Sequence, residues 1–219
     1  MNYVYLIPNW FFGFDSAMEI LFGIITLAVS FVAWKIYRIT QEKTVRHFSV
    51  GFFLIACSYI LWAGINMFVV SKASEGVHLL AWDNLAVMSL LGVYAHMLLL
   101  ISGLVTLAYT TFKIRNGGVY YIMLGLSLLV IVVSLNKIIT FRILSVFLLS
   151  FITYYYFIEY LFRQNKKTQR IFIAFFLLLL SNLDFVFSSH SYQAYVLGHF
   201  IQLGAYILIL MSLINSTKR

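Results

Sequence analysis

The chain has 219 residues, of which 63% are hydrophobic and only 10% are charged, and its formal net charge is +8. A soluble domain carries roughly a quarter charged residues, so this composition excludes an ordinary soluble protein and predicts an integral membrane protein. The positive charge does not indicate nucleic-acid binding, because the basic residues lie in short clusters between long apolar segments. Cys57 is the single cysteine, which excludes an internal disulfide.

Seven apolar segments are long enough to cross a lipid bilayer, which takes about 20 residues in a helix. In chain order they cover about 15–37, 48–70, 80–110, 118–135, 141–162, 171–188 and 192–214. None of them contains proline, so we expect continuous helices, and their short connections make neighbouring helices antiparallel. The fourth has few polar residues and is expected at the periphery. The sequence therefore predicts an all-α fold, an integral membrane seven-helix serpentine bundle forming a single domain over residues 1–219.

Lys and Arg residues lie mainly on one side of this bundle. Twelve of them follow the first, third and fifth segments or end the chain, and only Lys72, Lys137 and Arg142 fall on the other side. Because cytoplasmic connections are enriched in Lys and Arg, we expect the N-terminus outside, the C-terminus in the cytoplasm, and the cell membrane as the location. A cytoplasmic signalling partner, if there is one, is expected at the same basic connections.

Polar side chains recur at helical spacing inside five of the segments. Such groups are costly in lipid and face the bundle interior, and residues three, four or seven positions apart share one face of a helix. The candidate ligand-binding residues on these stripes are Glu19, Trp62, Asn66, His96, Asp184, His199 and Gln202. In the sixth segment Asp184 shares its face with Ser181, whereas Asn182 is rotated away. These stripes predict an outward-opening polar cavity with His96 at its floor and His199 on its wall.

Four of these candidates also have a purely structural explanation. Ser16 and Glu19 match a capping box, which by itself would account for the glutamate. Asp184 lies near a segment end, where water can solvate it. A neutral histidine such as His96 or His199 can hydrogen bond across helices and have no other role.

Several chemistries were compared with these residues. Retinal is excluded because it needs a Schiff-base lysine and the last segment has none. His96 and His199 could ligate haem, or bind zinc together with Asp184, although the chain has no HExxH motif. A metal- or haem-dependent membrane enzyme using the two histidines is therefore one alternative. A small-solute transporter of the three-plus-one-plus-three layout is another, but such sugar transporters use prolines in their spans as hinges, and here the spans lack proline.

Residues 12–20, 33–40 and 198–206 resemble small seven-helix membrane proteins of archaea that have no assigned function. The resemblance implies a prokaryotic cell membrane and a stand-alone bundle, similar in layout to the membrane sensor part of some signalling proteins. It brings no functional residues with it.

A helical bundle with an outward polar pocket can bind a ligand and change its packing in response. Histidine near acids titrates in the physiological pH range, so a proton or a metal cation is also a candidate signal. The sequence therefore predicts a receptor-like or sensory multi-pass membrane protein that binds a small ligand, proton or cation, with no resident cofactor.

Overall fold

The computed structural model describes residues 13–74, 79–112, 116–187 and 192–217, and these residues form seven helices. The helices are α1 (Phe14–Thr40), α2 (Lys43–Ser74), α3 (Leu79–Thr111), α4 (Gly117–Val133), α5 (Lys137–Arg163), α6 (Lys166–Phe187) and α7 (Tyr192–Thr217). Each apolar segment of the sequence corresponds to one of them, so the predicted all-α fold with seven helices is confirmed.

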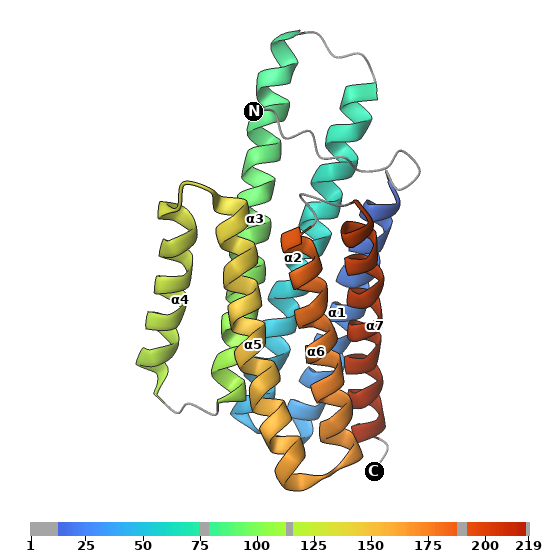
Figure 1. Cartoon of the computed structure of the whole chain (residues 1–219). Coiled ribbons are helices and arrows are strands. Elements are labelled where there is room, and N and C mark those ends of the chain that lie inside the picture. The colour runs from blue at the N-terminus through green and yellow to red at the C-terminus, as the bar shows by residue number, and fades with distance from the viewer. Residues whose placement is uncertain (1–12, 75–78, 113–115, 188–191, 218–219) are drawn as a thin grey trace.

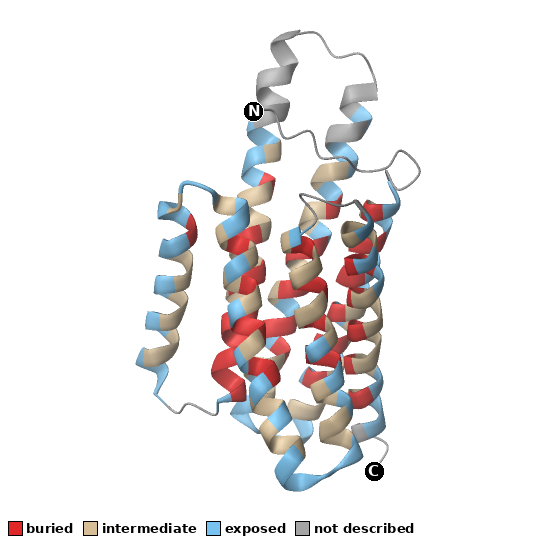
Figure 2. Cartoon of the chain, viewed as in Figure 1, coloured by how far each residue is buried: buried red, intermediate tan, exposed pale blue. Residues whose placement is uncertain are grey.

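Six of the seven helices are long and apolar enough to cross a membrane, whereas α4, with 17 residues, is shorter. Buried residues lie mainly on the helix faces that point into the bundle, and exposed residues lie mainly on the outward faces (Figure 2). Many of the exposed side chains are large and apolar, for example Phe31, Ile122 and Phe147. A surface of this kind suits lipid and not water, which indicates a multi-pass membrane protein.

Asparagine and glutamine side chains lie at several helix ends. Asn116 begins α4 by accepting a hydrogen bond from Gly118 N, and Asn136 begins α5 by accepting one from Ile139 N. Gln41 and Gln164 follow the last residues of α1 and α5 and adopt left-handed backbone conformations with φ of 57° and 45°. The Asn136 cap separates α4 from α5 at the weakest break in the hydropathy pattern.

Six helices form a closed ring in the order α1, α2, α3, α5, α6 and α7, with α7 returning to contact α1. α4 lies outside this ring and contacts only α3 and α5 among the described residues (Figure 1). We call the end at which α1 begins the upper end, as in Figure 1, and the opposite end the lower end. Neighbouring helices of the ring are antiparallel except at two contacts, α1 with α7 and α3 with α5, which are parallel. These two contacts divide the ring into a first half, α1–α3, and a second half, α5–α7.

Glycines set the closest approaches in the first half. A Cβ atom added to Gly103 on α3 would lie 2.8 Å from the carbonyl oxygen of Gly51 on α2 and 2.6 Å from Ile55 Cγ1. A Cβ on Gly92 would lie 2.5 Å from Ile65, and one on Gly23 would lie 2.6 Å from Ile60. Small residues let helix backbones approach closely in lipid, and here they bring α2 against both of its neighbours.

Candidate functional site

A cavity of about 600 Å³ occupies the centre of the ring and is lined by side chains from all six ring helices. Its volume lies in the range of about 300–1,000 Å³ that is usual for small-molecule sites. The lining begins at the upper end with Gly13 and Asp15 of α1 and reaches Leu107 of α3 in the lower half of the ring. The cavity therefore runs along the axis of the bundle and not between a pair of helices.

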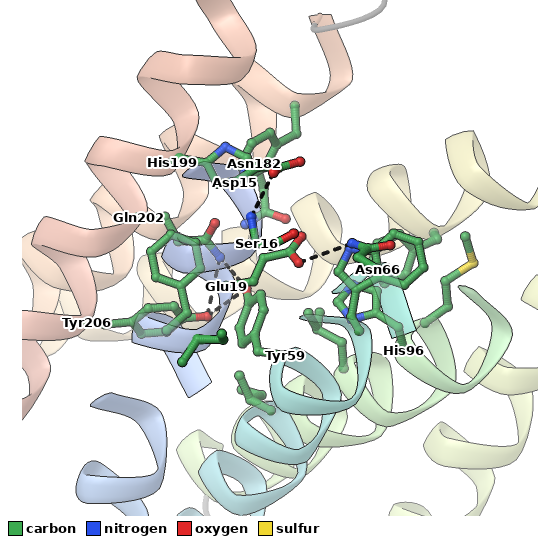
Figure 3. Close-up of a pocket in the computed structure, with 18 of the residues that line it drawn as sticks. Asp15, Ser16, Glu19, Tyr59, Asn66, His96, Asn182, His199, Gln202 and Tyr206 are labelled. Carbon is green, nitrogen blue, oxygen red and sulfur yellow. Dashed lines mark hydrogen bonds between the residues drawn. The ribbon is translucent and has the colours of Figure 1, made fainter. Parts of the chain in front are cut away.

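Glu19 of α1 is buried, and its carboxylate lies in the cavity wall with two hydrogen-bonding partners. Asn66 Nδ2 donates to Glu19 Oε2 at 3.3 Å, and the Trp62 indole also hydrogen bonds to the carboxylate (Figure 3). The capping-box explanation for Glu19 is wrong, because α1 begins at Phe14, after Gly13, and Ser16 lies inside the helix. The helix start is instead stabilised by Asp15, whose Oδ1 accepts hydrogen bonds from Gly13 N and Ser16 N.

His96 of α3 lines the cavity and is held by Ser58 of α2. Its Nδ1 lies 2.7 Å from Ser58 Oγ, and Ser58 Oγ donates to the carbonyl oxygen of His96 at 2.9 Å. Because the Ser58 hydroxyl hydrogen is used in that bond, His96 Nδ1 is the donor to Ser58, and Nε2 is the acceptor of the neutral ring. Trp62, Tyr59 and Phe141 surround the ring with centroids 5.5–5.9 Å away.

One face of α7 lines the cavity along its length with Tyr195, His199, Gln202 and Tyr206. His199 is buried against Phe22 and Phe185, and its Nδ1 donates to the carbonyl oxygen of Tyr195 at 2.9 Å. Gln202 Nε2 donates to the hydroxyls of Tyr59 and Tyr206, which lie 3.1 Å apart. Gln202 and the two tyrosines thus form a hydrogen-bonded belt that joins α7 to α2 across the ring.

Asp184 of α6 does not line the cavity, although the sequence predicted that it would. The buried face of α6 carries Phe175, Leu178, Ser181, Asn182 and Phe185, and Asn182 is the polar residue of α6 in the lining. Asn182 is buried, and its amide nitrogen donates to Leu178 O at 2.9 Å. The stripe was assigned to the wrong face because Ser181 lies at its edge and is compatible with either neighbour.

Arg142 lines the cavity, whereas the sequence predicted only that it lies on the outer side with Lys72 and Lys137. It lies on α5, whose contribution to the cavity was not predicted, and its guanidinium carbon lies 4.7 Å from the centroid of the Phe185 ring. The Asn136 side chain accepts from Ile139 N at the start of α5, so Arg142 lies within the second turn of this helix. Asp15 and Tyr59 were also missed, the first because it is the first residue of the expected segment and the second because tyrosine is common in apolar helices.

The lining changes from polar to apolar along the axis. The polar lining residues lie toward the upper end, with Asp15 and Glu19 in the first turns of α1, Asn66 bonded to Glu19, and Arg142 near the start of α5. On α7, His199 precedes Gln202 and Tyr206, which together with Tyr59 form the belt below these residues. Below the belt the lining consists of Phe52, Ile55, Leu100, Leu104, Leu107, Leu149 and Leu178. The cavity is therefore polar at its upper end and apolar at its lower end.

A metal site of the usual kind would need three or more closely placed ligands. Within the described parts of the chain, no three His, Cys, Asp or Glu side chains are grouped in that way. His96 and His199 lie well apart, on opposite sides of Glu19 in the view of Figure 3.

Comparisons with protein-family models, with curated proteins and with solved structures find no match to this chain. The chemistry of the cavity therefore has to be inferred from its own residues. These offer carboxylate, amide and imidazole acceptors, one guanidinium and several aromatic faces, which is a set suited to binding a polar or charged group.

Proposed function

We propose that all seven helices cross the membrane. α3 and α5 lie side by side and run in the same direction, so the chain between them has to return along the bundle, and α4 is that return. At about 1.5 Å per residue its 17 residues extend about 26 Å, close to the thickness of about 30 Å of the hydrocarbon core. Its exposed side chains, such as Tyr121, Ile122 and Leu126, are compatible with lipid on its outer surface.

The upper end then faces outward and the lower end faces the cytoplasm. The described basic residues at the lower end are Lys35, Arg38, Lys43, Arg46, Arg163, Lys166, Lys167 and Arg170. The upper end carries Lys137, while Arg142 lines the cavity. The side chains of Lys72, Lys113, Arg115, Lys218 and Arg219 lie outside the described residues. The positive-inside rule favours this orientation, in the cell membrane.

The protein acts as a receptor-like membrane protein that binds a small ligand from the outer side. One observation carries this proposal: polar side chains from all six ring helices converge on one cavity that begins at the upper end. A ligand there contacts both halves of the ring at once. Any difference in its contacts between two arrangements of the halves shifts the population of those arrangements.

The change would reach the cytoplasmic end through the helices themselves. The belt of Tyr59, Gln202 and Tyr206 connects α2 of the first half to α7 of the second, directly below the polar residues. Helices are stiff elements, so a small rotation at the belt displaces their lower ends. The basic connections at that end are where a separate signalling partner would detect the displacement.

A small-solute transporter is the second candidate, and the arrangement of the ring supports it. The first and second halves have the same helix order and the same directions, and the α3–α5 contact has its counterpart in the α7–α1 contact. Parallel repeats around an axis along the membrane normal occur in transporters, whose substrate sites lie between the repeats. The cavity lies between the halves here too.

Paired spin labels can test the receptor proposal and separate it from transport. The labels are attached to Thr44→Cys on α2 and Phe162→Cys on α5 in a Cys57→Ala background; both positions are exposed at the lower end, one in each half. Binding is followed by fluorescence of Trp62 in a variant whose other tryptophans, at positions 10, 34 and 82, are replaced by phenylalanine. The probes are protons, zinc, amino acids, sugars and alkylamines.

A receptor is expected to bind one probe and to change the distance between the labels, without accumulating that probe inside vesicles. Replacing His199 with Ala is expected to weaken both responses. Binding without a change in the label distance would contradict the receptor proposal, and uptake of the bound probe into vesicles would favour the transporter. If no probe alters Trp62 emission while the protein remains folded, both proposals fail for these classes of ligand.

A further inference from the structure

We infer that the ligand is a single-chain amphiphile with a cationic head group, bound with its head above the belt of Tyr59, Gln202 and Tyr206 and its hydrocarbon chain below it. This inference rests on the proposed function in one respect, that the central cavity is a ligand site. It adds the chemical class of the ligand and the direction in which it lies.

The length and character of the cavity favour a chain-like ligand. On α3 the lining extends from Val93 to Leu107, a rise of about 21 Å at about 1.5 Å per residue. One leaflet of the hydrocarbon core, which one lipid chain spans, is half of about 30 Å. The cavity can therefore hold a head group and a chain end to end, whereas a compact polar solute would leave its apolar part unused.

The lower part of the cavity offers the chain only apolar contacts. Side chains from four helices line it: Phe52 and Ile55 of α2, Leu104 of α3, Leu149 of α5 and Leu178 of α6. An unoccupied apolar cavity loses dispersion contacts along its lining, and a hydrocarbon chain restores them. A polar group at this depth would find no hydrogen-bonding partner among these apolar side chains.

The charges above the belt favour a cation. Asp15 and Glu19 lie one helical turn apart on the cavity face of α1, and both are buried. Arg142 supplies the one guanidinium of the lining, so two carboxyl groups face a single fixed positive charge. A cation can pair with the carboxyl group that the guanidinium does not balance, whereas an anion would find only this one guanidinium to pair with.

Acceptors and aromatic rings around Glu19 match an ammonium group. The neutral His96 and His199 each donate through Nδ1, which makes Nε2 an acceptor in both rings. Trp62 hydrogen bonds to Glu19 and lies beside His96, and Tyr59 and Tyr195 also line this part of the cavity. Carboxylates together with aromatic faces are the usual partners of ammonium ligands.

Three probes with the Trp62 reporter test the inference in lipid nanodiscs. Hexadecylamine has both the cationic head and the chain, hexadecanoate has the chain with an anionic head, and butylamine has the head with a short chain. Affinities are expressed per mole of lipid, so that partition of the long chains into the bilayer does not count as binding. Hexadecylamine is expected to bind at least tenfold more tightly than either of the other two.

Two variants separate the head from the chain. Glu19→Gln is expected to weaken hexadecylamine about tenfold and to leave hexadecanoate unchanged or slightly stronger, because it removes the carboxyl group that an ammonium can pair with and keeps the side-chain shape. Leu104→Phe fills the lower part and is expected to weaken hexadecylamine and not butylamine. If Leu104→Phe does not fold, an alkylamine series from four to sixteen carbons on the unaltered pocket supplies the same comparison.

Tighter binding of hexadecanoate than of hexadecylamine would overturn the assignment of the head, and equal binding of butylamine would overturn that of the chain. If hexadecylamine fails to bind but another probe binds and moves the spin labels, the inference fails and the receptor proposal stands. If hexadecylamine binds with no movement of the labels, the inference stands and the receptor proposal fails.

Discussion

The two halves of the ring are packed in different ways. In α1–α3, glycines bring α2 close to its neighbours, and Gly51 and Gly103 place backbone against backbone. In α5–α7, large aromatic rings fill the contacts: Tyr156 of α5 stacks on Phe175 of α6 with centroids 5.2 Å apart. The first half should therefore be sensitive to added volume and the second to lost volume.

This difference also has a consequence for movement around the cavity. Two helices in direct backbone contact can slide little past one another, because closely packed interiors contain no empty space into which atoms can move. In the second half, a Cβ atom added to Gly198 would lie nearest to side-chain atoms of Phe185, and not to a backbone atom. We therefore expect the second half, with Arg142 and His199, to move against a fixed first half when a ligand binds.

The largest expected loss of stability follows from removing the aromatic contact between α5 and α6 in the second half. Phe175→Ala removes a ring that is 1% exposed and is expected to destabilise the protein by about 3 kcal/mol, because the cavity left behind cannot be filled. The measurement is the free energy of unfolding in mixed micelles. Phe176→Ala, at the exposed neighbouring position, is the control and should change this value little. Equal losses in both variants would show that the stacked pair is not what holds α5 to α6.

An addition of volume tests the first half. Gly103→Ala is expected to destabilise by about 2 kcal/mol, since overpacking typically costs about 1–3 kcal/mol and the new Cβ would meet the Gly51 carbonyl oxygen at 2.8 Å. Gly64→Ala on α2 is the matched control, because a Cβ there has no atom within 4 Å. Thermal unfolding of the two variants in the same detergent should separate them. A Gly103→Ala variant as stable as the control would mean that α2 and α3 are not closely packed.

Hydropathy was sufficient to predict this fold but not its arrangement. The seven helices follow from apolar length, a property that each segment has by itself. The few polar residues of the fourth segment also predicted its peripheral position, which is confirmed by its contacts with α3 and α5 alone among the described helices. The order of the closed ring depends on which helices meet, and Gly51 with Gly103 or Tyr156 with Phe175 are contacts between different helices. A glycine such as Gly103 permits a close approach of two helices, but the sequence does not identify the partner.

The candidate site was predicted where one helix face was unambiguous. Tyr195, His199, Gln202 and Tyr206 form a strict stripe on α7, and all four line the cavity. Prediction failed where a polar residue lay near a segment boundary or where two faces were equally polar. Arg142 was counted with the basic residues of the outer side although it lies near the start of the fifth expected segment. Asp184 was preferred to Asn182 because it shares a helix face with Ser181.

The third prediction concerns the belt between the halves, where a smaller loss of stability is expected. Tyr59→Phe removes the hydroxyl that lies 3.1 Å from Tyr206 and accepts from Gln202, and is expected to destabilise by about 1 kcal/mol. It should also increase the spread of distances between spin labels on Thr44→Cys and Phe162→Cys. Tyr121→Phe, on the exposed face of α4, is the control for loss of a hydroxyl. A narrow, unchanged distance distribution would show that the belt does not couple the halves.

The smallest expected effect concerns the hydrogen bonds between α1 and α2. Ser30 Oγ donates to Ser49 O, and Ser49 Oγ donates to Ser30 O, each at 2.9 Å. Ser49→Ala removes one of these bonds and should destabilise by about 0.6 kcal/mol, the average for such bonds between membrane helices. Ser150→Ala is the control, because the Ser150 hydroxyl bonds to Val146 O of its own helix. If the two variants lose equal stability in unfolding titrations, then the first half is held by close backbone approach alone, and its polar stripe below Glu19 contributes nothing specific to the pairing of α1 with α2.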